Sequence, residues 1–380
     1  MKLLINMISL FQAGPKTVGL AFLEGLLNGY SGSELCLMLP EDRDFRTFIE
    51  THGGQLSGNG VSWVFVPYPR DPLRFLRKLY YDHVLTARLA RQGGFDRIFM
   101  MANFPSLLSS KRQYVLQHNP FYLEESRNLP KEMKGARFSL EKLLFTIGVR
   151  KCKRFIVQTD HIKGLLVSLY GVPPENIAVV HMAPLCNGTA SSQGKPPFAG
   201  HDRTLKLFFP AKLHPHKNHS IAIEAAEFIK TTKRSVRIFV TLSPTEWEQF
   251  SPELRKRGLL DTVINLGYIN NWEISGYYAA ADALFFPTQS ESLGFPYLEA
   301  LTCGLPIITF DFPVAREVCG AAALYFDLAD RSSLERVIES LDDREAMAHL
   351  REEAVRQGAR YGRKWEEISH EMLTFVTGRI

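Results

Sequence analysis

Two carboxylates, Glu291 and Glu299, flank the short sequence SLGFPYL. The apolar residues 283–286 are typical of a buried parallel strand, which would end before Glu291. If both acids lay on one helix, eight steps of about 100° would put them roughly 80° apart. We therefore expect Glu291 in a loop and Glu299 on the following helix, from where both can face one ligand. Because ionised carboxylates only accept hydrogen bonds, that ligand should carry several hydroxyl groups.

A helix N-terminus is predicted between these acids. Pro296 suits the first helical position, where a missing N–H costs nothing, and Gly304 followed by Pro306 would end the helix. The N–H groups around Gly294 and Phe295 would lie at the start of the helix, and the glycine permits a close approach. This is a natural anion site, so the ligand is expected to carry phosphate as well as hydroxyls.

The 380 residues exceed what one hydrophobic core comfortably supports, so two domains are expected. Apolar runs of strand length alternate with helix-length stretches in both halves of the chain. We predict strands at residues 3–8, 35–39, 63–66, 97–101, 114–117, 155–158, 177–180, 205–209, 236–241, 263–266, 283–286, 306–309 and 323–326. This alternation is typical of two doubly wound α/β domains, whose ligands bind beyond the C-terminal ends of the strands, in a cleft between the domains.

A segment rich in Gly, Ser, Pro and Ala at residues 186–203 is interpreted as the interdomain linker. It would separate an N-terminal domain at residues 1–185 from a C-terminal domain at residues 204–362. The helical pattern at residues 363–380 is expected to cross back to the first domain.

Compartment can also be predicted from composition. Five scattered cysteines with no CxxC pair indicate free thiols in a reducing environment. The N-terminal sequence MKLLINMISL resembles a first strand, since a signal peptide would need a longer apolar core. No stretch reaches the roughly 18 consecutive apolar residues of a membrane span. We therefore expect a cytoplasmic protein.

Several motifs together resemble a known family. The sequences FFPT, ESLGFPYLE, ALTCGLPIIT and VAREVCGAAALYF follow one another closely, and PAKLHPHKNHSIAIEA precedes them. They are similar to the retaining GT-B glycosyltransferases with an E-x7-E motif, also called glycosyltransferase family 4 or glycosyl transferases group 1. The resemblance implies two Rossmann-like domains facing across a cleft, the first binding the acceptor and the second the nucleotide-sugar donor.

The resemblance implies a role for each residue of the motif. Glu291 would contact hydroxyls of the donor sugar, and Glu299 would contact the ribose hydroxyls of the nucleotide. Gly294, Phe295 and Pro296 would line the sugar and phosphate region, the first two through backbone N–H groups. Taken alone, the two acids could equally be a solvated loop residue and a helix-surface residue.

A basic pair, Lys212 and Lys217, would neutralise the donor diphosphate by the same resemblance. Lys212 stands where the family usually has arginine, so the charge is kept but the bidentate grip is lost. The alternative is a pair of solvated lysines. The neighbouring His214, His216 and His219 lack the usual spacing of zinc ligands, and the lysines would repel a cation. We therefore expect no metal.

Two residues of the first half also match the family. Gly14, in a turn expected at residues 9–16, resembles the glycine whose backbone meets the diphosphate across the cleft; otherwise it is an ordinary turn glycine. His118 follows the strand at 114–117, where many relatives carry a histidine near the donor sugar and the acceptor; otherwise it is structural. With Glu291 and Lys217, His118 completes the catalytic candidates. In the retaining mechanism of this fold, a leaving-group oxygen can take the acceptor proton, so no dedicated nucleophile is required.

The net charge of +5 is concentrated in the presumed acceptor domain. The segment from Arg70 to Arg91 contains six basic residues and two acids. The segment from Lys131 to Arg154 contains eight basic residues and two acids. Large apolar residues interleave with the second cluster, which suits peripheral contact with anionic lipid at the inner face of a membrane. The alternative is core-facing helices with solvated basic flanks. No recognition motif accompanies the charge, so no nucleic acid is expected.

We therefore predict a retaining glycosyltransferase. It would move a sugar from a UDP-, GDP- or ADP-sugar to a hydroxyl of a glycan or a lipid-linked acceptor, in cell-surface polysaccharide or lipopolysaccharide biosynthesis. No separate cofactor is expected. Two alternatives stay open: a relative with other chemistry, such as a sugar-nucleotide epimerase or a phosphorylase, and a non-enzymatic two-lobed ligand-binding protein.

Overall fold

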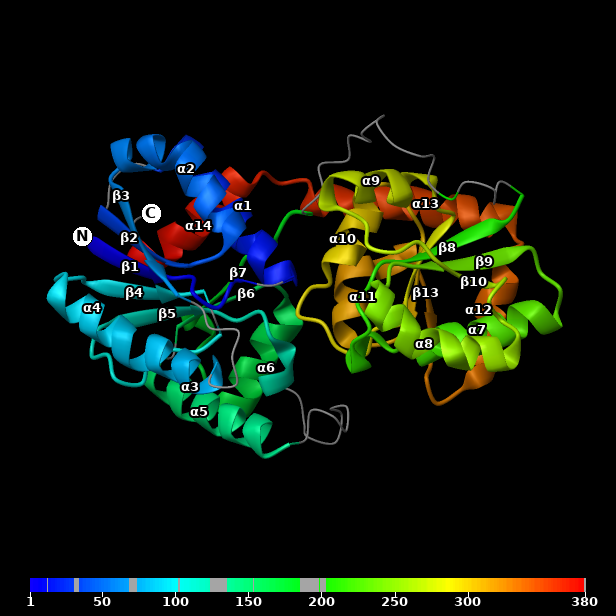
Figure 1. Cartoon of the computed structure of the whole chain (residues 1–380), viewed down its shortest axis with the longest axis horizontal. Coiled ribbons are helices and arrows are strands. Elements are labelled where there is room, and N and C mark those ends of the chain that lie inside the picture. Colours follow the sequence, from blue (N-terminus) through cyan, green and yellow to red (C-terminus); the bar gives the residue numbers. More distant parts are fainter. Residues whose placement is uncertain are drawn as a thin grey trace. The chain divides into compact units, whose positions relative to one another are not determined.

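The computed structural model describes residues 1–11, 13–30, 34–67, 74–101, 103–123, 135–152, 154–184, 198 and 203–378. The chain divides into two compact units (Figure 1). Unit 1 comprises Met1–Ala183 and Arg363–Ile380, and unit 2 comprises Pro184–Gly362. Of the linker expected at 186–203, only residues 198 and 203 are among the described residues.

Unit 1 contains a seven-stranded sheet in the order β3-β2-β1-β4-β5-β6-β7, with every pairing parallel. Its strands are β1 (Lys2–Asn6), β2 (Glu34–Pro40), β3 (Val61–Val66), β4 (Arg97–Met100), β5 (Arg112–Leu116), β6 (Phe155–Val157) and β7 (Ile177–Val179). All seven strands predicted for this half are confirmed, with ends that differ by one or two residues.

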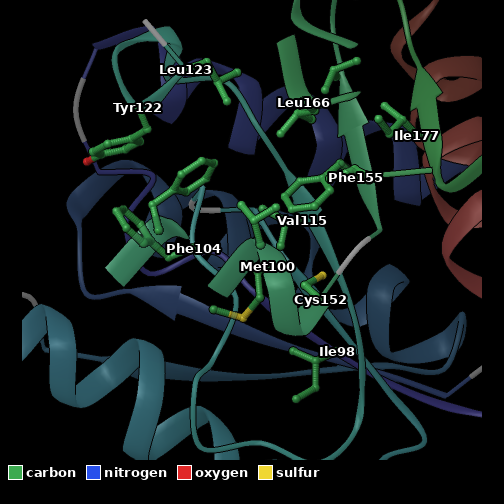
Figure 2. Packing of buried hydrophobic residues seen from close by; sticks show 14 of the residues in the cluster. Ile98, Met100, Phe104, Val115, Tyr122, Leu123, Cys152, Phe155, Leu166 and Ile177 are labelled. Carbon is green, nitrogen blue, oxygen red and sulfur yellow. The ribbon is translucent and has the colours of Figure 1, made fainter. Parts of the chain in front are cut away.

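Helical segments connect these strands. They are α1 (Ala13–Gly29), α2 (Arg43–Gly58), α3 (Arg74–Leu79), the π-helical η1 (Tyr80–Leu85), α4 (Thr86–Gln92), η2 (Pro120–Tyr122), α5 (Ala136–Cys152), α6 (Asp160–Tyr170), η4 (Pro174–Asn176) and the C-terminal α14 (Trp365–Thr377). The strands are apolar along their length because helices cover both faces of a parallel sheet. Figure 2 shows part of this core, in which Met100, Val115 and Phe155 from three strands pack with Cys152 of α5 and Leu166 of α6.

Helix α14, the last helix of unit 1, packs on α1, the first (Figure 1). The Ser369 hydroxyl donates a hydrogen bond to the Phe22 carbonyl oxygen at 3.3 Å. The approach is close because Gly25 has no side chain: a Cβ there would lie 2.3 Å from Ser369 Oγ. At the end of α14, the Arg97 guanidinium donates to the Val376 carbonyl oxygen at 2.5 Å.

Unit 2 contains a six-stranded, all-parallel sheet in the order β10-β9-β8-β11-β12-β13. Its strands are β8 (Leu205–Phe209), β9 (Val236–Val240), β10 (Val263–Asn265), β11 (Ala283–Phe286), β12 (Ile307–Phe310) and β13 (Ala323–Phe326). All six predicted strands are confirmed. The strand order reverses at β8, so the loops after β8 and β11 lie side by side at the C-terminal edge, where doubly wound sheets bind ligands.

The helical segments of unit 2 are η5 (Pro215–Lys217), α7 (Ser220–Thr231), α8 (Pro244–Arg257), α9 (Asn271–Ala280), α10 (Phe295–Thr302), α11 (Pro313–Cys319), η6 (Gly320–Ala322), α12 (Arg331–Ser340), α13 (Arg344–Gly358) and η7 (Ala359–Tyr361). None of the helices within the described ranges has the length and hydrophobicity of a membrane span. Four of the five cysteines are described, and all four are free thiols.

Candidate functional site

The loops after β8 and β11 are joined by an ion pair between Lys217 and Glu291. The Glu291 Oε1 atom that receives the ammonium also accepts a hydrogen bond from the Thr288 hydroxyl at 2.8 Å. The Lys217 and Glu291 side chains are only 17% and 14% exposed, so water screens the pair little. Two residues 74 positions apart are therefore held at one point of the sheet edge.

Main-chain contacts fix the same two loops. The His216 carbonyl oxygen accepts hydrogen bonds from the Gln289 N–H at 2.9 Å and from the Thr288 hydroxyl at 3.2 Å. The Lys217 ammonium also lies 4.6 Å from the ring centroid of Phe286, the last residue of β11. A cation over an aromatic face is attracted by the ring. The ammonium is thus positioned before any ligand arrives.

Helix α10 begins directly after this pair. It starts at Phe295, one residue before the predicted first position, with Pro296 in its first turn and Gly294 as the capping residue. Gly294 has a φ of 81°, and a Cβ there would lie 2.5 Å from the Tyr297 ring. Only glycine therefore fits at this position. The N-terminus of α10 carries a partial positive charge. Because Gly294 has no side chain, a ligand can approach the backbone there closely.

Glu299 lies on α10 as predicted, but it is buried. Its Oε2 atom accepts a hydrogen bond from the Tyr278 hydroxyl of α9 at 2.7 Å. Burial raises the pKa of Glu299 to about 7, although the bond from Tyr278 acts in the opposite direction. A carboxyl group with that pKa exchanges its proton near neutral pH, so it can either donate or accept hydrogen bonds.

The loop that carries Lys217 also carries Lys212. Lys212 is exposed, and the loop beside it is anchored by the Leu213 N–H, which donates to Glu246 Oε1 at 2.9 Å. Burial lowers the pKa values of His216 and His219 to about 4, so both are neutral. Among the residues that the structure describes, no group of three or more His, Cys, Asp and Glu side chains could hold a metal ion.

His118 lies at the C-terminal end of β5 in unit 1. The backbone N–H groups of His118 and Asn119 both donate to Asn103 Oδ1, at 2.8 and 2.9 Å. Asn103 has a φ of 68°, a left-handed conformation that asparagine tolerates better than most residues. Burial lowers the pKa of His118 to about 4. Its Nδ1 atom is buried without a hydrogen-bond partner in the described part of the chain.

The placement predicted for Gly14 was wrong. Gly14 is the second residue of α1 and does not lie in the turn after β1. The helix can begin this early because Pro15, the third residue, lacks only an N–H that has no partner in a first turn. Lys16 in the same turn pairs with Asp42 at 2.7 Å.

The sequence alone did not reveal three supporting residues: Tyr278, Thr288 and Asn103. Thr288 stands in the FFPT sequence, so its motif could have drawn attention to it. Tyr278 lies 21 residues from Glu299 and Asn103 lies 15 residues from His118, so each pair spans more than one element and no local pattern marks it.

Part of the chain is similar to a known protein family. Residues 196–357 match the family described as "Glycosyl transferases group 1". This region, which makes up most of unit 2, therefore resembles that family. The matched region contains Lys212, Lys217, Glu291 and Glu299, whereas Gly14 and His118 lie outside it.

Individual relatives are similar to about half of the chain. The O-antigen chain mannosyltransferase RfbU of Salmonella typhimurium is 27% identical over 53% of this chain, and D-inositol 3-phosphate glycosyltransferase 2 of Catenulispora acidiphila is 26% identical over 55%. The matches span about half the length of these relatives, 54% and 52%.

Two solved structures share the fold over nearly the whole chain. Anabaena Alr3699/HepE in complex with UDP-glucose superimposes with a TM-score of 0.73 at 15% identity, and the alignment covers all of both chains. WaaG, described as a glycosyltransferase involved in lipopolysaccharide biosynthesis, gives a TM-score of 0.72 at 15% identity over 99% of this chain and 100% of its own. The chain therefore has the GT-B fold.

Proposed function

We propose that this chain transfers a sugar from a nucleoside diphosphate sugar to a hydroxyl group, with retention of anomeric configuration. The observation that carries the proposal is the Lys217–Glu291 pair beside the N-terminus of α10. The pair offers a positive group for phosphate and a carboxylate for sugar hydroxyls at one point of the sheet edge. The match of residues 196–357 to a glycosyl transferase family supports this proposal.

Charge stabilisation would be the main catalytic contribution of unit 2. As the bond between the sugar and the diphosphate breaks, the leaving group gains negative charge, which Lys217, Lys212 and the helix N-terminus at Gly294 and Phe295 would stabilise. Glu291 would exchange its ion pair for hydrogen bonds from donor-sugar hydroxyls, and Glu299 would accept from the ribose. The scheme uses no metal ion.

The reaction balances without a protein nucleophile. The acceptor oxygen forms the new bond to the anomeric carbon on the face from which the diphosphate leaves, and a diphosphate oxygen takes the acceptor proton. His118 of unit 1 would lie near the donor sugar and the acceptor. The low pKa of His118 favours a neutral imidazole that exchanges hydrogen bonds with hydroxyls.

The acceptor would be a glycan or a lipid-linked glycan of the cell surface, at the inner face of a membrane. The names of RfbU, an O-antigen chain mannosyltransferase, and WaaG, involved in lipopolysaccharide biosynthesis, support this class. The donor would be a UDP-, GDP- or ADP-sugar. Because the HepE structure contains UDP-glucose, UDP-sugars should be tested first.

The test is a donor panel followed by turnover. Purified protein would be heated with each nucleotide sugar, because a ligand of the native state raises the melting temperature by mass action. The stabilising donor would then be incubated with candidate glycan acceptors, and the anomeric configuration of the product read by NMR. We expect nucleotide release that requires acceptor and a retained configuration. Release without acceptor, or an inverted product, would overturn the proposal.

A further inference from the structure

Exposed apolar side chains gather on one part of unit 1. In the described part of the chain, twelve large hydrophobic residues are exposed, and seven of them belong to α3, η1, α5 and the segment 107–112. They are Leu76, Tyr80, Val84, Leu108, Leu140, Leu143 and Ile147. Leu76 and Leu108 are both 60% exposed. Exposed apolar residues that cluster in this way indicate an interaction surface.

These elements form one continuous surface. The Arg137 guanidinium at the start of α5 lies 4.9 Å over the Phe75 ring of α3. Further along, the Leu107 N–H donates to His83 Nδ1 of η1 at 3.3 Å, and the Lys151 ammonium of α5 donates to the Leu107 carbonyl oxygen. The segment 107–112 therefore bridges η1 and α5, and Figure 1 shows α3 and α5 on the same side of the unit.

Helix α5 is apolar on two faces. Phe145 and Val149 are fully buried in the core of unit 1. Leu140, Leu143 and Ile147 recur at the spacing of one helix face and lie exposed on another side. A surface helix ordinarily has a polar outer face. Leaving these three apolar side chains in water is unfavourable, so the face is suited to a partner that covers it.

The charge around this surface is positive. Exposed basic residues on α3, α4 and α5 are Arg77, Arg88, Arg91, Arg137, Arg150 and Lys151. Only two acids occur on α3, η1, α4 and α5, and each is paired: Asp82 with Lys78 at 2.6 Å, and Glu141 with Arg137 at 3.0 Å. The surface therefore complements a negatively charged partner. Arg70, Lys131, Lys134 and Lys153, which also belong to the basic clusters of the sequence, lie outside the described residues.

A cavity of about 300 Å³ opens beside the apolar residues, at the start of β5 and the end of α5. Its charged lining consists of Lys111, Arg112, Lys151 and Arg154, and no carboxylate lines it. None of these four cations forms an ion pair within the described residues. Four unneutralised cations around one cavity suit a phosphate group, which accepts charge-assisted hydrogen bonds.

We propose that α3, η1, α5 and the segment 107–112 form a docking surface for an anionic lipid bilayer, and that the cavity holds a lipid phosphate headgroup. The exposed leucines and Ile147 would enter the headgroup region while the arginines contact anionic lipid. Helix α5 is about 25 Å long. Its first part contacts Tyr122, near the C-terminal edge of the sheet, and its last residues line the cavity. A bilayer along it would pass close to the edge that carries His118, within reach of a lipid-linked acceptor.

The test is flotation of the purified full-length protein with vesicles, without any nucleotide sugar. Vesicles of phosphatidylcholine alone would be compared with vesicles that also contain phosphatidylglycerol. We expect binding only to the anionic vesicles, and weaker binding as salt is added. Because no donor is present, failure here would leave the proposed transfer reaction untouched, and inactivity in transfer would leave this surface untouched.

Two variants and their matched controls locate the surface. Lys111→Gln with Arg112→Gln removes two charges from the cavity, and binding should fall roughly 25-fold at low salt, since each charge near a bilayer contributes about 5-fold. Arg255→Gln with Lys256→Gln makes the same change on α8 of unit 2 and should bind as the wild type does. Leu143→Ser with Ile147→Ser should also release the vesicles, unlike Leu260→Ser with Val355→Ser in unit 2. Circular dichroism would confirm that each variant is folded.

Three results would overturn the proposal. Equal binding to neutral vesicles, or unchanged binding of the cavity variant, would exclude a headgroup site. A wild-type dimer that Leu143→Ser with Ile147→Ser converts to a monomer, without vesicle binding, would make this face a contact between two copies of the chain. Stabilisation by inorganic phosphate that depends on Lys111 and Arg112, again without vesicle binding, would make the cavity a site for soluble anions.

Discussion

The Lys217 ammonium and the Glu291 carboxylate are each other's counter-ion at the C-terminal edge of the second sheet. Each is held by a second contact as well, Lys217 by the Phe286 ring and Glu291 by the Thr288 hydroxyl. A donor that binds here must therefore supply a negative group to Lys217 and hydroxyl donors to Glu291. A sugar linked to a diphosphate offers both.

Replacing Lys217 by alanine should impair transfer far more than stability. The variant loses a fixed positive charge at the leaving group, and such a loss lowers the rate by roughly 100-fold to 1,000-fold. The measurement is kcat/KM with the donor found in the panel, together with the melting temperature. Lys256→Ala, at an exposed site on α8, serves as the control. A Lys217→Ala variant within threefold of the wild type would argue against a role at the diphosphate.

Gly294→Ala should destabilise unit 2 strongly. The new Cβ would lie 2.5 Å from the buried Tyr297 ring, and the backbone has a φ of 81°. Gly267→Ala is a matched control, because Gly267 has a φ of 76° but open space around it. Both variants force alanine into a positive φ, which costs about 1 kcal/mol. The difference between their unfolding free energies therefore measures the clash of the new Cβ with the Tyr297 ring. Equal stabilities of the two variants would show that Tyr297 moves away freely.

The stability of the protein should depend on pH through Glu299. Its folded pKa of about 7 lies above the ordinary 4.5, so the folded state holds the proton more tightly than the unfolded state. The stabilising effect of this proton on the folded wild type is therefore complete below pH 4.5, and it is lost as pH rises to 7. Glu299→Gln should become the more stable protein over that interval, by about 3 kcal/mol at 1.36 kcal/mol per pKa unit.

Urea denaturation of both proteins from pH 5 to 8 would measure this difference. Glu248→Gln removes the same charge at an exposed position on α8 and serves as the control. A flat difference for Glu299→Gln as well would mean that folding does not raise the pKa of Glu299. If ribose hydroxyls donate to Glu299, donor affinity should increase as pH rises through 7.

Gly25→Ala should loosen α14 from α1. A Cβ at Gly25 would meet Ser369 Oγ at 2.3 Å and the Trp365 carbonyl oxygen at 2.6 Å. Overpacking of this kind costs about 1–3 kcal/mol. Gly54→Ala on the exposed side of α2 has open space and should instead stabilise by about 1 kcal/mol, because alanine favours helix. Hydrogen exchange of the α14 amides would show whether that helix opens first.

Several features could be predicted from the sequence because their cause is local. A strand buried in a parallel sheet needs a short continuous apolar run, and each of the thirteen strands has one. The order of strand, loop and helix placed Glu291 and Glu299 correctly for the same reason. Gly14 was placed in a turn because its neighbours allow either a turn or a first helical turn, and only packing distinguishes the two.

The basic, apolar stretch of α5 shows where local information ends. The alternatives were a core-facing helix and a surface that contacts lipid, and the structure assigns different side chains of one helix to each: Phe145 to the core, and Leu140, Leu143 and Ile147 to the surface. All four are large and apolar, so residue type cannot separate them.

Local patterns in the sequence are enough to predict the thirteen strands, the doubly wound class, and the loop and helix positions of the two acids. The folded structure was needed to show that Lys217 meets Glu291, that Tyr278 reaches Glu299 and that Asn103 holds the backbone at His118. Strands and helices are set by the apolar or polar character of neighbouring residues. These contacts instead join residues 15 to 74 positions apart, and they form only when the elements that carry them pack together.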